Sequence, residues 1–116
     1  MRVLAALAKK YGVETEVIQA NDPSPALDLK GYAFTLTEEA IARTFPGLPV
    51  SPYVVTGATD CRFYEEVCNN CVRFAPVIYG TEQLEGMHGI DENIETNCLP
   101  GAVEYYKNII RLQEEF

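Results

Sequence analysis

The chain has 116 residues, 47% of them hydrophobic and 22% charged, which is typical of one soluble domain and too apolar for a disordered segment. Its formal net charge of −8 argues against a nucleic-acid partner, since phosphates attract clustered Lys and Arg. No apolar run approaches the roughly 20 residues that span a bilayer, so we expect no membrane partner and a cytoplasmic location.

The first twenty residues predict a short amphipathic helix followed by a strand. The apolar stripe of the helix is formed by Val3, Leu4, Leu7, Ala8 and Tyr11. Gly12 follows where a left-handed cap is expected, and residues 13–17 alternate apolar or β-branched side chains with acidic ones, like a strand with one face in water. Neither element can bury its apolar face alone. We therefore expect residues 1–20 to belong to a unit whose remainder is missing or supplied by another chain.

The strongest break in the sequence is residues 21–26, where two prolines remove backbone donors and favour extended conformations. This predicts a linker. Beyond it, Thr35 and Glu38 have the spacing of a capping box for a helix that runs to about Phe45. Pro46 and Gly47 then predict the end of that helix.

A strand, a helix and a second strand are expected next. Residues 53–56 form a continuous apolar and β-branched run, which favours a strand covered on both faces. A short helix over residues 60–67 follows, with Thr59 or Asp60 as its N-cap. Residues 72–78 alternate enough for a strand, and Pro76 implies that it lies at the edge of a sheet or that the strand ends there.

Residues 79–90 contain three glycines and no periodicity, and predict a loop. From Pro100 onward a helical stripe continues to the C-terminus, formed by Ala102, Val103, Tyr106, Ile109, Ile110 and Leu112. Strands that alternate with helices after residue 26 predict an α/β fold.

The four cysteines, at positions 61, 68, 71 and 98, are expected to be reduced and buried as small apolar side chains. Cys68 and Cys71 have the C-x-x-C spacing used in zinc and redox sites. No second C-x-x-C accompanies them, which favours the structural interpretation.

A polar cluster, Gly57-Ala58-Thr59-Asp60-Cys61-Arg62, follows the first of these strands. Ligands of α/β proteins bind at this end of strands, and Arg62 could bind a carboxylate through two parallel hydrogen bonds. The alternative is structural, with Asp60 capping the helix and Arg62 paired at the surface with Glu65 or Glu66.

The only histidine, His88, lies between Gly86 and Gly89 and precedes Asp91 and Glu92. A lone loop histidine is usually solvated, but this setting could turn an imidazole toward a cation, with Glu92 accepting from the other ring nitrogen. A zinc site needs about four ligands. The local sequence supplies one histidine, so it assembles no complete site and no general base.

Taken together these segments resemble a known family, the co-catalytic zinc amidohydrolases and exopeptidases that include aminoacylase, carboxypeptidase S, succinyl-diaminopimelate desuccinylase and glutamate carboxypeptidase. Residues 57–64, GATDCRFY, are similar to its G-[GA]-T-D-x-R-[FHY]-[YI] block. Residues 72–76, VRFAP, resemble its Y-R-F-x-P strand, and residues 87–94, MHGIDENI, its H-G-x-[DN]-E-x-I motif. Order and spacing agree over residues 27–116.

The resemblance implies roles for individual residues. His88 stands where the family has its last zinc ligand, and Arg62 where an arginine binds the carboxylate of an N-acyl amino acid or peptide. Gly57, Ala58 and Thr59 would shape the substrate pocket. Glu92 remains a candidate to orient His88, and no catalytic residue is expected in this chain.

The resemblance also implies a division of the chain: residues 1–20 as a remnant of the lid or dimerisation domain, 21–26 as a linker, and 27–116 as the C-terminal part of an αβα catalytic domain. The family's H-x-D motif, bridging aspartate, paired glutamates and general base lie outside these residues. We therefore expect a fragment of a zinc-dependent amide hydrolase that is inactive alone. The alternative is a non-catalytic scaffold derived from that fold. Either would expose apolar surface, so a homo-oligomer, or association with a missing N-terminal segment, is expected.

Overall fold

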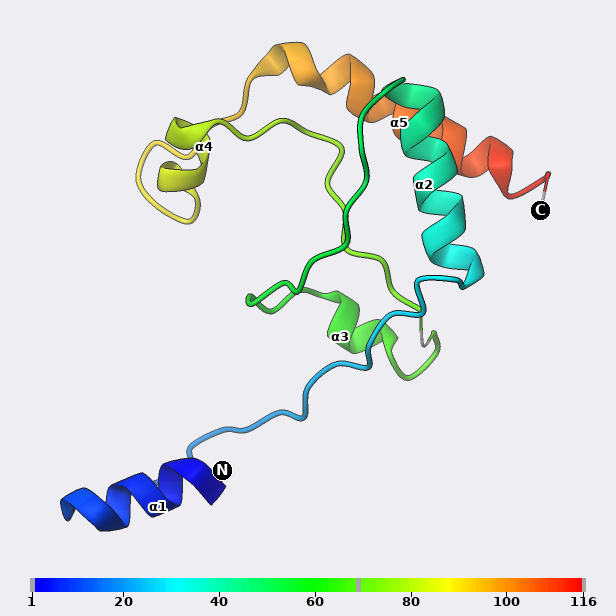
Figure 1. Cartoon of the computed structure of the whole chain (residues 1–116). Helices are drawn as coiled ribbons and strands as arrows, with labels where there is room; N and C mark the ends of the chain where they lie inside the picture. The colour runs from blue at the N-terminus through cyan, green and yellow to red at the C-terminus, as the bar shows by residue number, and fades with distance from the viewer. Residues whose placement is uncertain (1, 69, 116) are drawn as a thin grey trace.

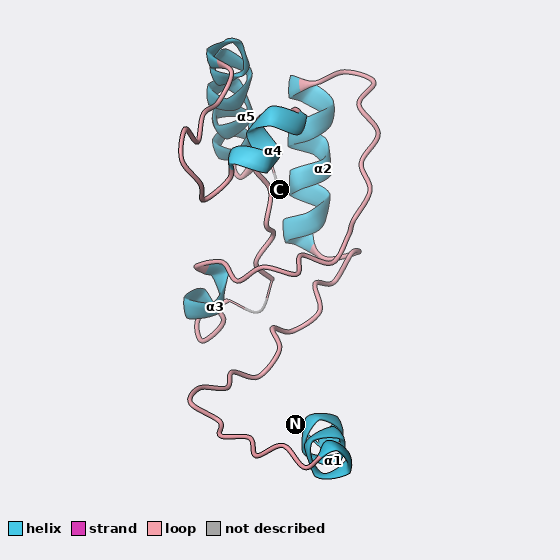
Figure 2. Cartoon of the chain, turned by 90° about the vertical axis from the view of Figure 1, so that its left-hand side faces the viewer, coloured by secondary structure: helices cyan, strands magenta, loops and turns pink. Residues whose placement is uncertain are grey.

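The computed structural model describes residues 2–68 and 70–115, and the regular structure of this part is helical (Figure 2). In chain order the elements are the helices α1 (Arg2–Tyr11), α2 (Tyr32–Thr44), α3 (Cys61–Tyr64) and α4 (Thr81–Gly86), the 3-10 helix η1 (Thr96–Cys98) and the helix α5 (Leu99–Leu112). Long irregular segments join them. The radius of gyration is 18.9 Å, against roughly 13 Å for a compact chain of this length, so the chain is extended.

The core lies between α2 and α5, which cross one another in Figure 1. Its buried cluster comprises Leu36, Ala40 and Ile41 of α2 and Tyr105 and Leu112 of α5, with Phe45 and Ile109 packed at its edge. Most of these positions are three or four residues apart along their helices, which places them on one face of each helix. A hydrogen bond from Asn108 Nδ2 to Thr44 Oγ1, 3.0 Å long, joins the two helices beside the cluster.

Arg43 links the end of α2 to the residues that follow α5. It donates from Nε to Glu39 Oε1 at 2.8 Å and from Nη2 to Glu115 Oε2 at 2.7 Å. The hydrogen bond with Glu115 is the main reason that the pKa of Arg43 is raised above its ordinary value. The same bond lowers the pKa of the Glu115 carboxyl. Because these side chains are exposed, the contact fixes the geometry of the pair more than it stabilises the fold.

Two expected helices are confirmed, one at each end of the described chain. α1 covers residues 2–11, and Gly12 has a φ of +65°, the left-handed conformation expected of a cap. The N–H of Val13 donates to the carbonyl of Ala8 at 2.9 Å, which closes a Schellman motif. α5 has Pro100 in its first turn, where the missing N–H costs no hydrogen bond.

The three expected strands are wrong, because residues 13–17, 53–56 and 72–78 are irregular and the described part of the chain contains no strand (Figure 2). A strand needs a second segment whose backbone pairs with its own. Tyr53 and Val54 are 82% and 86% exposed, so the run expected to be covered on both faces is covered on neither. The α/β fold class is therefore not supported by the described residues, which are helix and loop.

Several helix boundaries also differ from expectation. The helix expected to run to about Phe45 is confirmed as α2, which ends at Thr44, but it begins at Tyr32. Thr35 makes no capping box: its hydroxyl donates to the carbonyl of Gly31 at 3.2 Å. The helix expected over residues 60–67 is reduced to α3, and the side chain of Asp60 makes no capping hydrogen bond. Residues 79–90, expected to be a loop, contain α4.

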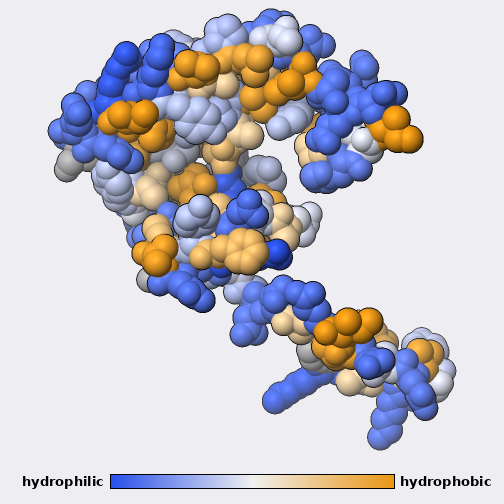
Figure 3. Space-filling view, turned by 180° about the vertical axis from the view of Figure 1, so that it is seen from behind, coloured by the Kyte–Doolittle hydropathy of each residue, from blue (hydrophilic) through white to orange (hydrophobic). Residues whose placement is uncertain are grey.

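α1 lies apart from the other helices and makes no contact with them in the described chain (Figure 1). Its exposed apolar side chains form an orange patch at the lower right of Figure 3. Together with Val13 and residues 15–17, α1 lines an open hollow of about 730 Å³, to which Leu4 and Leu7 contribute. None of the described helices has the length and hydropathy to cross a membrane. The division at residues 20 and 26 stays a prediction.

Candidate functional site

The segment that holds Gly57, Ala58 and Thr59 leads into α3 through two backbone hydrogen bonds. The carbonyl of Thr59 accepts from the N–H of Arg62 at 3.3 Å, and the carbonyl of Asp60 accepts from the N–H of Phe63 at 2.9 Å. A Cβ added at Gly57 would meet nothing within 4 Å. The side of the Gly57 backbone on which that Cβ would lie is therefore open to a ligand or to another segment of protein.

Arg62 is exposed in the first turn of α3, and its guanidinium carbon lies 4.6 Å from the ring centroid of Phe63. The expected surface alternative, a pair with Glu65 or Glu66, is wrong: within the described residues Arg62 forms no ion pair, and Glu65 pairs with Arg73. Stacking on an aromatic face leaves the planar edge of a guanidinium free for a carboxylate. The donors of Arg62 are therefore accessible from solvent.

Arg73 organises this region, a role that the sequence did not reveal. Its Nε donates to Thr59 Oγ1 at 2.9 Å, and its Nη2 lies 3.2 Å from Ser24 Oγ and 3.4 Å from Glu65 Oε1. One half-buried cation therefore connects the linker, the segment before α3 and the residue that follows α3. The available signal was a single charge within an otherwise apolar segment, residues 71–78.

His88 lies in a tight turn, residues 87–92, which we call the His88 turn. His88 has a φ of +62° and Asp91 a φ of +63°, both in the left-handed region. For residues with a side chain this conformation costs roughly 1–2 kcal/mol each, so other contacts must hold it. One is the N–H of Gly89, which donates to the carbonyl of Gly86 at 2.9 Å. A Cβ at Gly89 would lie 3.2 Å from that oxygen, which favours glycine there.

Glu92 contacts the backbone of the turn. Its Oε2 accepts a hydrogen bond from the backbone N–H of His88 at 3.3 Å. This hydrogen bond holds the backbone at His88 and leaves the ring exposed at the surface. A carboxylate bound in this way stabilises the closed turn. The expectation that Glu92 accepts from the imidazole ring stays a prediction.

Gln83 and Asn93 connect the two ends of the His88 turn. The side-chain oxygen of Gln83 accepts from the N–H of Gly80 at 3.1 Å, and its nitrogen donates to Asn93 Oδ1 at 3.0 Å. Asn93 Nδ2 in turn donates to the carbonyl of Asp91 at 2.9 Å. The sequence carried a signal for half of this network, since a glutamine three residues after an N-cap residue is typical of a capping box.

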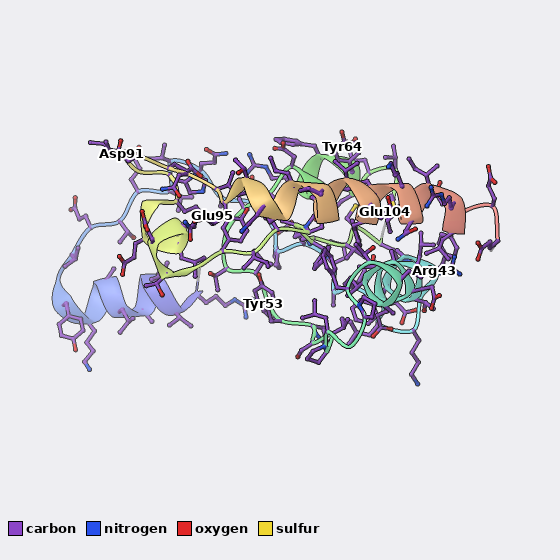
Figure 4. The ribbon with its side chains drawn as sticks, turned by 90° about the horizontal axis from the view of Figure 1, so that it is seen from above. Arg43, Tyr53, Tyr64, Asp91, Glu95 and Glu104 are labelled. Carbon is purple, nitrogen blue, oxygen red and sulfur yellow. The ribbon has the colours of Figure 1, made fainter. Side chains whose placement is uncertain are left out.

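The described residues do not bring the two clusters together. α3 makes no contact with α4, and Figures 1 and 2 both place the two helices apart. Figure 4 likewise separates Tyr64 of α3 from Asp91 of the His88 turn. Within residues 2–68 and 70–115 no group of three His, Cys, Asp or Glu side chains could hold a metal ion. A metal site that includes His88 would need ligands from elsewhere.

The four cysteines are free thiols, and none of them is fully buried. Cys68 is exposed and the other three are half-buried, so the expectation of buried small apolar side chains is wrong for this chain. Burial is the main reason that the pKa of Cys71 is raised, and the neighbouring Cys68 and Cys61 add to it. A raised pKa disfavours the thiolate that metal binding and redox chemistry require.

Comparison with known proteins gives a family match over most of the chain. The sequence model of Peptidase family M20/M25/M40 matches residues 6–112. A "Probable carboxypeptidase S-like 2" of Dictyostelium discoideum is 28% identical over 95 residues, which are 82% of this chain and 18% of that protein. An "N-fatty-acyl-amino acid synthase/hydrolase PM20D1" of Xenopus tropicalis is 30% identical over 104 residues, which are 89% of this chain and 20% of that protein.

The human protein of the same name is 26% identical over 102 residues, 85% of this chain and 20% of its own length. The chain therefore spans about a fifth of the length of the curated relatives that it matches. No solved structure matches.

Proposed function

The chain belongs to Peptidase family M20/M25/M40, and from this we propose that it takes part in zinc-dependent hydrolysis of an amide bond in peptides or N-acyl amino acids. The observation that carries the proposal is the family match over residues 6–112, which includes both the Gly57–Arg62 segment and the His88 turn. Because the relatives are about five times longer, we propose that this chain is the C-terminal part of such an enzyme and is inactive alone.

Arg62 is the residue proposed to bind the substrate carboxylate. Its guanidinium is exposed, stacks on Phe63 and forms no ion pair in the part of the chain described. A guanidinium fork matches a carboxylate in two parallel hydrogen bonds. The names of the relatives, carboxypeptidase S-like and N-fatty-acyl-amino acid synthase/hydrolase, point to substrates that carry a carboxylate near the amide bond. Gly57, Ala58 and Thr59 are proposed to shape the pocket beside it.

His88 is proposed to supply one zinc ligand. The described residues by themselves do not fit a complete zinc site, because no group of three potential ligands is present among them. We therefore propose that the other ligands and the general base come from residues outside this sequence, and that Glu92 fixes the backbone from which the imidazole projects. An imidazole at the surface, on a turn closed by several hydrogen bonds, is suited to meet ligands from another segment.

A grafted enzyme tests this proposal. In it the 116 residues replace the matching segment of the Xenopus tropicalis relative, and hydrolysis of an N-fatty-acyl amino acid is measured. We expect the grafted enzyme to be active. The substitution His88→Ala should abolish hydrolysis and lower the amount of bound zinc by one equivalent per enzyme. Arg62→Ala should lower kcat/KM by about 30-fold or more, the value of a lost charge-assisted hydrogen-bond pair.

Arg111→Ala, at an exposed arginine of α5, is the matched control and should leave kcat/KM unchanged. A grafted enzyme that keeps full activity with His88→Ala would contradict the ligand role. The isolated chain is expected to hydrolyse nothing at any zinc concentration. Turnover by the pure 116-residue chain would refute the proposal that it is inactive alone.

Exposed apolar residues favour a second candidate function, a self-associating scaffold. Leu4 and Leu7 are exposed on α1, and Val103, Tyr106 and Ile110 form an exposed stripe on α5. Contiguous apolar surface of this kind is unusual on a monomer. This candidate predicts a dimer or larger species in sedimentation that persists with His88→Ala. A monomeric chain at micromolar concentration would exclude it.

A further inference from the structure

Gln83 differs from the other polar side chains near His88 because it is almost fully buried, with 7% of its surface exposed. Both the oxygen and the nitrogen of its side-chain amide form hydrogen bonds. The oxygen accepts from the N–H of Gly80 at the start of α4, and the nitrogen donates to Asn93 beyond the His88 turn. A buried amide whose donor and acceptor are both satisfied is costly to misplace, so it fixes the segments that it joins.

The two segments joined by Gln83 are the two ends of the His88 turn. α4 leads into the turn, and Asn93 is the first residue after it. Asn93 in turn contacts the turn itself: its Nδ2 donates to the carbonyl of Asp91, one of the two residues with a left-handed backbone. Gln83 therefore bears on the conformation of the turn through Asn93, without contacting His88.

We propose that Gln83 is a positioning residue for His88: its amide closes the His88 turn through Asn93 and keeps His88 and Asp91 in the left-handed conformation. The direction of the imidazole follows from that backbone. This inference rests on the proposed function only in giving His88 a ligand role; the closure of the turn does not depend on it.

Two substitutions separate the two halves of the amide's role. Gln83→Leu removes both hydrogen bonds. Gln83→Glu keeps an oxygen to accept from the N–H of Gly80, so α4 keeps its cap, but it cannot donate to Asn93. Asn93 can then satisfy a carboxylate only by turning its Nδ2 toward residue 83, which releases the carbonyl of Asp91. Glu85→Gln, on an exposed residue of the same helix, is the matched control.

Amide hydrogen exchange can be measured by NMR on the full 116-residue chain, without metal or substrate. It reports separately on the two hydrogen bonds of Gln83, the one that caps α4 and the one to Asn93. The N–H of Leu84 donates to the carbonyl of Gly80 at 3.0 Å and reports on α4, and the N–H of Gly89 donates to the carbonyl of Gly86 at 2.9 Å and reports on the turn. With Gln83→Glu we expect exchange at Gly89 to accelerate about tenfold, the equivalent of one net hydrogen bond, while Leu84 is unchanged. Glu85→Gln should change neither.

Because His88 is the only histidine, its ring gives one NMR signal that follows the imidazole directly. We expect that signal to shift and sharpen toward a freely rotating ring with Gln83→Glu and Gln83→Leu. If Gly89 exchange and the ring signal match the unsubstituted chain in both variants, Gln83 does not position His88. If Gln83→Glu matches the unsubstituted chain and only Gln83→Leu accelerates exchange, at Leu84 and Gly89 alike, Gln83 is a helix cap and the proposal is overturned.

The grafted enzyme provides a second, independent readout. A positioning role predicts that Gln83→Glu lowers kcat at least several-fold and leaves KM within about twofold, because the proposed carboxylate site at Arg62 is separate from the turn. Unchanged kcat would overturn the positioning role. Failure of the proposed function would appear differently, as a grafted enzyme insensitive to His88→Ala, while the exchange measurement would still decide the role of Gln83.

Discussion

Replacing Leu112 with alanine tests whether the packing of α2 against α5 is the core of the described chain. Leu112 is 0% exposed and packs in the cluster formed by the two helices. The substitution removes three carbon atoms, worth about 2.4 kcal/mol at about 0.8 kcal/mol each. The cavity left behind raises the expected loss of unfolding free energy toward the upper part of the range of about 2–5 kcal/mol. A small core loses much of its stability with one such residue.

The matched control is Ile110→Ala, because Ile110 lies on the same helix but is 66% exposed. Its loss should stay within about 0.5 kcal/mol. Urea unfolding followed by circular dichroism gives the free energy of unfolding of both variants. If the Leu112→Ala variant is largely unfolded in water, amide exchange rates in α2 compare the two variants instead. α1 should be unaffected by either change. Equal losses in the two variants would refute the α2–α5 core.

Three further predictions follow from single contacts. Gly12→Ala should destabilise α1 by about 1–2 kcal/mol. The left-handed backbone is the only cause, since nothing lies within 4 Å of the added Cβ. Cα chemical shifts would detect fraying at the end of α1, and unchanged shifts would contradict this prediction. The pKa of Glu115 is lowered by Arg43, so its contribution to stability is present above the ordinary carboxyl pKa and is lost as the pH falls through the lowered value. Because the pair is exposed, the urea midpoints of the unsubstituted chain and Glu115→Gln should differ only slightly at neutral pH and converge in acid. Arg73→Met should remove about 1–3 kcal/mol of local stability from the Thr59 segment. Amide exchange should then be faster in that segment and unchanged in α5. An equal rise in exchange rates across the whole chain would argue against a local role of Arg73.

The helices could be predicted where the sequence itself contains the stabilising pattern. α5 has a periodic apolar stripe and Pro100 in its first turn, and α1 has a stripe that ends at Gly12, so each helix depends on residues within its own segment. The expected strands failed because a strand depends on a second segment that pairs with its backbone, and the described chain supplies none for the run at Val54. α4 was missed because it is short, has no apolar period and is held at its start by one side chain, that of Gln83.

The sequence pointed to the site residues one at a time, through motif resemblance, and left their connections undetermined. Arg62 and His88 could be singled out as candidates because the motifs around them resemble those of a known family, whereas the residue types alone left a surface ion pair and a solvated histidine open. The contacts of Arg73 with Thr59 and of Gln83 with Asn93 join residues 14 and 10 positions apart, through loops whose course no local pattern fixes. The contact of Glu92 shows the same limit: the sequence places it near His88, but does not reveal that its carboxylate accepts from the backbone N–H of His88.

The zinc site of the grafted enzyme tests the central claim most directly. A crystal structure with zinc located by anomalous scattering should place a zinc ion about 2.0–2.1 Å from a ring nitrogen of His88, with the remaining ligands from the Xenopus tropicalis portion. The left-handed backbone at His88 should be retained. A fully occupied zinc site whose ligands do not include His88 would contradict the claim that this chain supplies a metal ligand to an amide hydrolase.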